Sequence, residues 1–199
     1  MNTRLILASQ SAGRRAMLQE AGIPFEAREP GIEEEPAKEA LIAKGAAAPA
    51  IAEALAELKT VVISAAQRDV LVLGSDQVLV CEGRFYNKAR TRTEARATLE
   101  SLRGRTHRLV SAAVLSRNGK PVWRHWEAAD MTMRDFSDAF LDDYLEQEGD
   151  GLLGSVGCYR IEGLGAQLFA RVEGDHFVIR GMPLLPLLEA LRREGGLRA

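Results

Sequence analysis

A junction near the N-terminus gathers side chains that suit a phosphate site. Ser9, Ser11, Arg14 and Arg15 follow the apolar run 5–8 and precede apolar residues at helical spacing. N–H groups at a helix N-terminus point at an anion, and arginine forks donate charge-assisted hydrogen bonds to phosphate oxygens. A phosphate site is one interpretation. The other is that Ser11 only caps the helix while the arginines are solvated, and this segment favours neither.

A second polar group lies inside an apolar stretch from 70 to 80. The tetrapeptide Gly-Ser-Asp-Gln occupies 74–77, Lys88 follows it, and an acidic run at 33–35 precedes it. Mg²⁺ binds carboxylates together with phosphate oxygens, and a positioned carboxylate can deprotonate water. Asp76 could therefore act as metal ligand, as base, or as both. The alternative is a carboxylate that bonds a turn. A solvated face is the favoured interpretation for the acidic run alone, whereas chemistry is favoured for Asp76.

The cysteines and histidines show no spacing typical of a metal or redox site. Cys81 and Cys158 lie far apart without a CxxC pattern, so we expect two buried, apolar side chains. His107, His125 and His176 share no metal-ligand spacing, and we expect structural or surface histidines. The chain also lacks the G-x-S-x-G elbow of many serine hydrolases.

Composition bounds the class of protein. The chain has 199 residues, of which 46% are hydrophobic and 27% charged, which is typical of one folded domain, expected over 1–199. The net charge of −2 draws it to neither nucleic acid nor anionic lipid. No window is long and apolar enough for a signal peptide or membrane span, so we expect a cytoplasmic protein without membrane or nucleic-acid partners.

Strands and helices alternate along the chain and must position these groups. Residues 25–37 are rich in proline and acid and predict a loop, and the tetrapeptide is expected at the end of, or inside, a buried strand pair. The pattern is that of a mixed α/β fold. Strands are predicted at 5–8, 70–73, 78–80, 107–115 and 121–133, and helices at 16–21, 39–59 with an interruption at Pro49, 93–102, 137–148 and 184–193.

Together these segments resemble the Maf family of nucleotide pyrophosphatases. Short motifs of the family occur in its order over nearly the whole chain. This chain departs from them at Ala12, Glu33, Ala89 and Val178, none of which removes a charged catalytic group. The matches are S-x-S-P-R-R at 9–15 with one additional residue before the arginines, the acidic pair Glu33-Glu34, Lys59, G-[AS]-D-[TQ] at 74–77, the G-K-P lysine at Lys88, G-x-x-H at 104–107, Y-x-I-[QE]-G-x-G at 159–165, E-G-D at 173–175 and G-[LM]-P-L at 181–184.

The resemblance implies a fold and a reaction. The implied fold is an elongated, twisted mixed β-sheet with flanking helices and two lobes around a cleft, similar to inosine triphosphatases. The implied reaction is hydrolysis between the α- and β-phosphates of a nucleoside triphosphate, with Mg²⁺ or another divalent cation such as Mn²⁺. By the same resemblance, Asp76 accepts the proton of water, Glu34 and Asp76 bind the metal, and the phosphates are held by Ser9, Ser11, Arg14, Arg15, Lys59 and Lys88, the two lysines being catalytic.

The resemblance also assigns base choice to Gly13, Gln77 and Glu162. Gln77 and Glu162 resemble the branch that acts on 7-methyl-GTP, because a carboxylate can accept from both N1–H and the exocyclic amine of guanine. That branch usually has tryptophan at the position of Gly13, where it could stack on the base. dTTP and UTP are the next candidates. A rival hypothesis is a nucleotide-sensing protein that regulates division or septum formation, and a homodimer is left open.

Overall fold

The computed structural model describes residues 4–198, so residues 1–3 and 199 of the expected domain lie outside the described part. The described residues form two compact units, and strands β3 (Leu71–Cys81), β5 (Thr106–Arg117) and β6 (Lys120–Met133) contribute residues to both. The first unit comprises residues 4–77, 110–127 and 181–198, and the second comprises 78–109 and 128–180.

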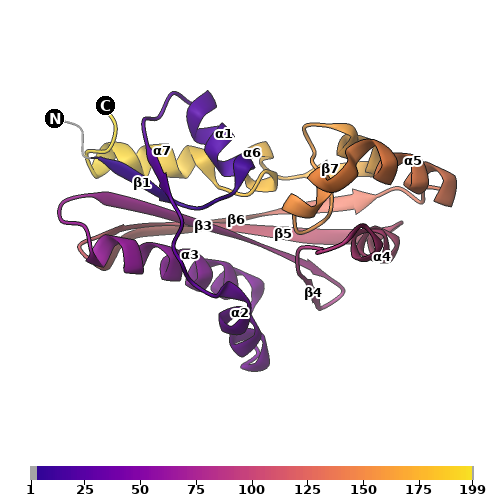
Figure 1. The fold of residues 1–199 in the computed structure, drawn as a ribbon, viewed down its shortest axis with the longest axis horizontal. Helices are drawn as coiled ribbons and strands as arrows, with labels where there is room; N and C mark the ends of the chain where they lie inside the picture. The colour runs from indigo at the N-terminus through magenta and orange to yellow at the C-terminus, as the bar shows by residue number, and fades with distance from the viewer. Residues whose placement is uncertain (1–3, 199) are drawn as a thin grey trace. The chain divides into compact units, whose positions relative to one another are not determined.

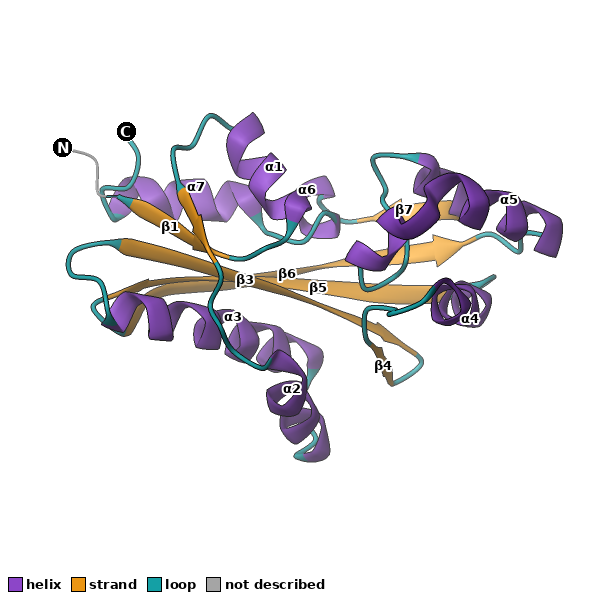
Figure 2. Ribbon diagram, in the orientation of Figure 1, coloured by secondary structure: helices purple, strands orange, loops and turns teal. Residues whose placement is uncertain are grey.

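The strands form a mixed sheet with the hydrogen-bonded order β2 (Glu26–Arg28), β1 (Leu5–Ala8), β3, β5, β6 and β7 (Phe169–Glu173), in which β4 (Arg84–Tyr86) also pairs with β3. Strand β1 (Leu5–Ala8) runs parallel to both β2 (Glu26–Arg28) and β3, whereas β4 is antiparallel to β3 and β7 is antiparallel to β6. Helices flank this sheet (Figure 2). The predicted mixed α/β fold with flanking helices is confirmed, and the sheet is open.

In the first unit, parallel strands are covered by helices on both faces (Figure 1). Helix α3 (Ala48–Ala65) covers one face, while α1 (Ala12–Glu20) and α7 (Leu184–Arg193) cover the other. All four residues of β1 are buried, as expected for a parallel strand enclosed on both sides. Ile6 and Val72 pack with Ile63 of α3, which assigns the even-numbered residues of β1 and β3 to that face.

Two predicted boundaries in this unit were wrong. The expected loop at 25–37 contains strand β2 and the start of helix α2 (Glu34–Ala43). The helix expected over 39–59 is two helices, because the chain turns between α2 and α3. Pro49 lies in the first turn of α3 instead of interrupting a helix, since a proline there removes no intrahelical hydrogen bond.

The neighbouring strands expected at 107–115 and 121–133 are confirmed as β5 and β6. They are joined by Asn118 and Gly119, whose φ angles of 51° and 75° suit a tight two-residue hairpin turn.

The second unit packs helices and short strands around its own apolar core, which includes Leu99, Leu102, Met131 and Leu141. The predicted cap at Ser137 is confirmed, because its hydroxyl accepts from the Phe140 N–H at 3.2 Å. No helix in residues 4–198 is long and apolar enough to cross a membrane. The elements of this unit are β4 (Arg84–Tyr86), α4 (Arg92–Leu102), α5 (Asp138–Glu148), β7 (Phe169–Glu173), α6 (His176–Ile179) and short 3₁₀ turns at Gly149–Gly154 and Leu164–Leu168.

Candidate active site

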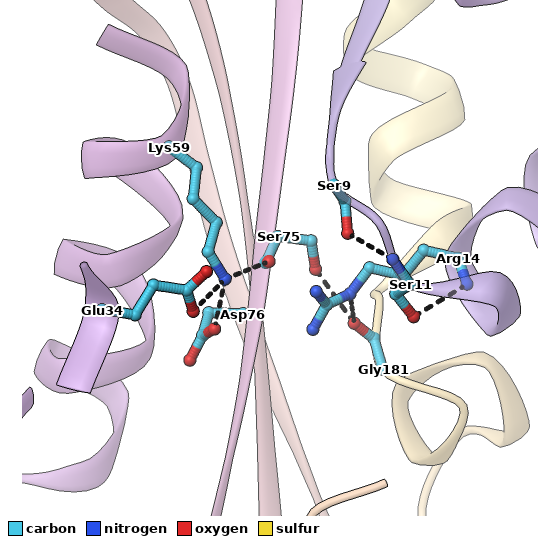
Figure 3. Close-up of polar contacts among 8 residues, drawn as sticks. All are labelled: Ser9, Ser11, Arg14, Glu34, Lys59, Ser75, Asp76 and Gly181. Atoms are coloured by element: carbon cyan, nitrogen blue, oxygen red, sulfur yellow. Dashed lines mark hydrogen bonds and ion pairs between the residues drawn. The ribbon is translucent and has the colours of Figure 1, made fainter. Parts of the chain in front are cut away.

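The Gly-Ser-Asp-Gln tetrapeptide lies inside strand β3, and strand geometry divides its side chains between two faces. Successive side chains of a strand point to opposite sides. Asp76 points to the face covered by α3, whereas Ser75 points to the face of α1 and the segment before α7 (Figure 3). Ser75 and Asp76 are both buried, at 0% and 8% exposure. A single strand therefore supplies polar groups to two adjoining clusters.

The termination of β1 brings the N-terminal junction to this part of β3. β1 pairs with β3 as far as Leu73, and β4 pairs with it from Leu79 onward. Residues 75–77 lie between these two pairings. Because β1 runs parallel to β3, its carboxyl end delivers Ser9 and the start of α1 to the same level of the sheet. Ligands of open α/β sheets bind at such strand ends.

On the α3 face, three charged side chains meet. The Lys59 ammonium lies 2.6 Å from Asp76 Oδ1 and 2.8 Å from Glu34 Oε2 (Figure 3). Lys59 also donates to the Ser75 carbonyl at 3.4 Å. Its side chain is 5% exposed and that of Asp76 11%, whereas that of Glu34 is 43% exposed. The cluster is therefore buried on the strand side and open on the α2 side.

On the opposite face, the carbonyl of Gly181 holds two donors. Arg14 Nε donates to it at 3.0 Å and the Ser75 hydroxyl at 2.9 Å. The Arg14 guanidinium extends from α1 toward Ser75 (Figure 3). Gln77 belongs to the same face, where its amide nitrogen donates to the Ser111 hydroxyl at 3.1 Å. Ser75 thus joins both clusters, through its carbonyl to Lys59 and through its hydroxyl to the acceptor of Arg14.

The remaining N-terminal residues shape the turn into α1. Ser9 is buried, and its hydroxyl accepts from the Ser11 N–H at 3.1 Å. Ser11 is the N-cap of α1, as one of the two interpretations of this segment expects, and Gly13 lies in the first helical turn. Arg15 donates to the Gln10 carbonyl at 2.6 Å, so it braces the turn from which Arg14 projects. The helix N-terminus and Arg14 retain the features of an anion site.

Three groups of this site were missed in the sequence. Ser75 and Gly181 lie within motifs of the family, but no role was assigned to them. Lys38 lies on α2 four residues after Glu34, a spacing that places both side chains on one helix face. That spacing is the sequence signal for Lys38, but it carries no weight under the prediction of a loop up to residue 37.

Burial and nearby carboxylates set the electrostatics of two cations. Burial lowers the pKa of the Arg14 guanidinium, and the charges of Asp76 and Glu34 partly oppose that shift. Arginine remains a cation in proteins. Burial also lowers the pKa of Lys38, while Asp76 and Glu35 oppose the shift. Asp76 is therefore under the influence of cations on both faces, which favours binding of a polyanion beside it.

Two predicted site residues belong to the second unit. Lys88 is exposed in the segment after β4, and Glu162 is exposed before the turn at Leu164–Leu168. Glu162 lies near Arg160, whose pKa is raised mainly by a hydrogen bond from its guanidinium to Glu148 and to a smaller degree by the charge of Glu162. Both predicted roles stay predictions.

Motif residues of the second unit form a buried cluster. His107 is 1% exposed, and its Nε2 shares a 2.6 Å hydrogen bond with the hydroxyl of Tyr159. Burial lowers the pKa of His107 to about 4, so the ring is neutral at neutral pH. The prediction of a structural histidine is confirmed at this position. Cys81 and Cys158 are buried free thiols, also as predicted.

The carboxylate pair suits a hard divalent cation. Asp76 Oδ1 and Glu34 Oε2 converge on one cationic nitrogen, so their geometry already accommodates a positive charge between them. Residues 4–198 contain no group of three or more acidic, histidine or cysteine side chains arranged for a metal. Mg²⁺ typically takes one or two carboxylates and completes its shell with water and substrate phosphate. The donor set therefore fits a metal shared with a phosphorylated substrate.

Comparison with known proteins identifies the family. The model of the family described as "Maf-like protein" matches residues 4–194. A protein of Granulibacter bethesdensis named nucleoside triphosphate pyrophosphatase is 51% identical over 98% of each chain. One of Caulobacter vibrioides with the same name is 50% identical over 98% of each chain. A protein of Rhizobium meliloti named 7-methyl-GTP pyrophosphatase is 49% identical over the whole of both chains. The chain belongs to the Maf family.

Proposed function

We propose that this protein is a nucleoside triphosphate pyrophosphatase that releases a nucleoside monophosphate and pyrophosphate. The observation that carries the proposal is the cluster in which Lys59 bridges Asp76 and Glu34 beside Arg14 and the N-terminus of α1. It combines a carboxylate base, a cation-binding pair and phosphate donors. Relatives that match over 98% of their own length and bear the name of this enzyme support the reaction.

Asp76 is the proposed base. Water attacks the α-phosphorus, the bond between that phosphorus and the bridging oxygen breaks, and Asp76 takes a proton from the water. The bridging oxygen leaves with the pyrophosphate. Burial of Asp76 on the strand side fixes its carboxylate, because β3 and Lys59 restrict its rotamers. This arrangement favours proton transfer at one defined position.

The cations beside Asp76 are proposed to hold the triphosphate. The Gly181 carbonyl orients the Arg14 fork through Nε, and the N-terminus of α1 adds N–H donors. Asp76 and Glu34 would hold Mg²⁺ or Mn²⁺, which when bound neutralises phosphate charge and polarises the reacting centre. Ser9, Ser11 and Arg15 shape this cradle, and Lys88 stays a proposed phosphate-binding residue on the strength of its motif.

The proposed substrate is 7-methyl-GTP, with dTTP and UTP as alternatives. The hydrogen bond from Gln77 to Ser111 fixes the orientation of the amide. A Cβ built at Gly181 would lie 4.0 Å from Gln77 Oε1, so this acceptor oxygen is beside Gly181 and Arg14. The Rhizobium meliloti relative carries the name of this specificity. Removal of modified nucleotides in the cytoplasm is the proposed purpose.

The decisive test is pyrophosphate release from a panel of triphosphates with Mg²⁺ present. We expect Asp76→Asn to lower kcat by about 100-fold or more, because a general base contributes at least that factor. Asp143→Asn is the matched control, since Asp143 is exposed on α5. Equal turnover by Asp76→Asn and the parent protein would refute the assignment of the base.

The same panel separates the enzyme from a nucleotide sensor. A protein that binds 7-methyl-GTP tightly and releases no pyrophosphate would support a sensing or septum-related role instead. Release of orthophosphate in place of pyrophosphate would show that cleavage occurs at another bond. Rates for GTP, dTTP and UTP measured in parallel give the base preference.

A further inference from the structure

Lys59 is the cation that the two proposed metal ligands share. Its Nζ lies 2.6 Å from Asp76 Oδ1 and 2.8 Å from Glu34 Oε2, and it donates to the Ser75 carbonyl at 3.4 Å. Its side chain is 5% exposed, so the ammonium is held between the carboxylates with little contact with water. A buried ammonium requires such acceptors, and here two of the three are the proposed metal ligands.

A divalent cation that uses the same two carboxylates must compete with this ammonium. Like charges a few Å apart repel each other, and the repulsion grows where water is excluded. A metal bound to Asp76 Oδ1 and Glu34 Oε2 would also share with the ammonium the two oxygens that Lys59 contacts. Binding of a metal alone is therefore opposed as long as Lys59 keeps its buried position and its three contacts.

A triphosphate removes this obstacle. Its oxygens can take over the contacts of the lysine, since a lysine ammonium binds phosphate as a compact charge on a flexible four-carbon stem. They also complete the shell of a hard cation that keeps only one or two carboxylates. The ion pair with Glu34 is the easier one to release, because the Glu34 side chain is 43% exposed.

We propose that Lys59 holds the Asp76–Glu34 pair against divalent cations until the triphosphate arrives, so that metal and triphosphate enter the site together. This inference rests on the proposed function, because it assumes that the pair serves a metal-dependent reaction. Lys59 thereby has two successive partners, first the carboxylates and then the phosphates. Its role is to couple occupancy of the metal position to the presence of substrate.

The test measures Mn²⁺ binding to the full-length protein by calorimetry, without nucleotide. We expect Lys59→Met to bind Mn²⁺ about tenfold more tightly than the parent protein, because a repelling unit charge next to the metal position is removed. Lys44→Met is the matched control, since Lys44 is an exposed lysine at the end of α2. It should bind Mn²⁺ as the parent does.

Three further measurements keep the test decisive. The double variant Lys59→Met with Asp76→Asn should lose the tenfold tighter Mn²⁺ binding. That loss would assign the tighter binding to this carboxylate pair. An α,β-methylene triphosphate, which cannot be cleaved at that bond, should tighten Mn²⁺ binding more strongly in the parent protein than in Lys59→Met. If Lys59→Met is unstable, the increase in its melting temperature on addition of Mn²⁺ should exceed that of Lys44→Met.

Mn²⁺ binding by Lys59→Met that is equal to or weaker than that of the parent would overturn the inference. Its failure is distinguishable from failure of the proposed function. If the protein releases pyrophosphate but Lys59→Met does not change the affinity for Mn²⁺, the proposed function is supported and the coupling is rejected. If Lys59→Met binds Mn²⁺ tenfold more tightly but the parent protein releases no pyrophosphate, the competition between Lys59 and the metal is supported and the proposed function is rejected.

Discussion

At the scale of single residues, the position of a side chain on strand β3 decides its partner. Asp76 meets Lys59 on the α3 face, and Ser75 meets Gly181 on the other. The sequence does not indicate a role for Ser75, because a serine beside an aspartate has no distinctive pattern. Its importance follows from contacts with groups 16 and 106 positions away along the chain.

Ser75→Ala removes the hydroxyl that shares the Gly181 carbonyl with Arg14. We expect kcat/KM for the triphosphate to fall about fivefold, because the lost hydrogen bond stabilises by about 1 kcal/mol and fixes the acceptor of Arg14. The free energy of unfolding should fall by a similar amount. Steady-state pyrophosphate release and chemical denaturation measure the two effects.

Ser64→Ala is the matched control for this prediction. Ser64 is also 0% exposed and accepts a hydrogen bond from the Gly119 N–H at 3.0 Å, but it lies near the end of α3. It should lose stability without a change in kcat/KM. If Ser75→Ala keeps the parental kcat/KM, the prediction is wrong and Ser75 has only a structural role.

At the scale of elements, β3 and α3 approach each other unusually closely, and this contact places Lys59 against Asp76. A Cβ built on Gly74 would lie 2.2 Å from the Ala56 carbonyl oxygen and 2.6 Å from Thr60 Cγ2. Only a residue without a side chain permits such an approach of strand and helix backbones. The motif glycine therefore sets the distance between the two elements that carry the charged cluster.

Gly74→Ala should push α3 away from β3. We expect a loss of about 3 kcal/mol in the free energy of unfolding, because the clash involves a backbone atom that cannot rotate away. Turnover should fall as well, since Lys59 moves with α3. Gly154→Ala is the control, because a Cβ at this position would have nothing within 4 Å, and it should leave both quantities near parental values. Parental stability of Gly74→Ala would contradict the close-packing argument.

At the scale of the whole molecule, the two compact units are stabilised by different kinds of packing. The first encloses parallel strands between helices, and the second has an apolar core of its own with a buried histidine. The hydrogen bond between His107 and Tyr159 and the ring contacts with Phe169 fix this core. Because the ring is buried and neutral, the stability of the protein should depend on pH.

The sign of that dependence follows from the pKa of His107, which burial lowers from 6.5 to about 4 and the charge of Asp130 partly restores. The unfolded chain takes up a proton near pH 6.5, but the folded chain takes it up only near pH 4. The contribution of His107 to the free energy of unfolding is therefore present above pH 6.5 and is lost as the pH drops toward 4. We expect protonation of His107 to lower the free energy of unfolding by about 2 kcal/mol between pH 7.5 and pH 5.

Chemical denaturation at several pH values measures this loss. His107→Gln keeps a group that can hydrogen-bond Tyr159 but cannot titrate, so its stability should change less between pH 7.5 and 5. His176→Gln is the control, because His176 is exposed and its variant should keep the parental pH dependence. Identical pH dependence in His107→Gln and the parent would show that other groups cause it.

The sequence by itself determined the family, the mixed α/β class and the chemistry of most candidate residues. Those inferences depend on local patterns such as the apolar run 5–8, the cap at Ser11 and the order of short motifs. Boundaries failed at 25–59, because proline and alanine content there resembles both loop and helix and cannot show where α2 begins.

Only the tertiary structure decided which groups meet. The meeting of Lys59 with Asp76 and Glu34, and of Arg14 with Gly181, depends on β1 ending beside β3 and on α3 lying against Gly74. Such contacts join residues that are distant in the chain. The local periodicity of the sequence does not show which distant residues lie close together in the folded protein. For the same reason the coupling proposed for Lys59 is a property of the folded protein and has no motif of its own.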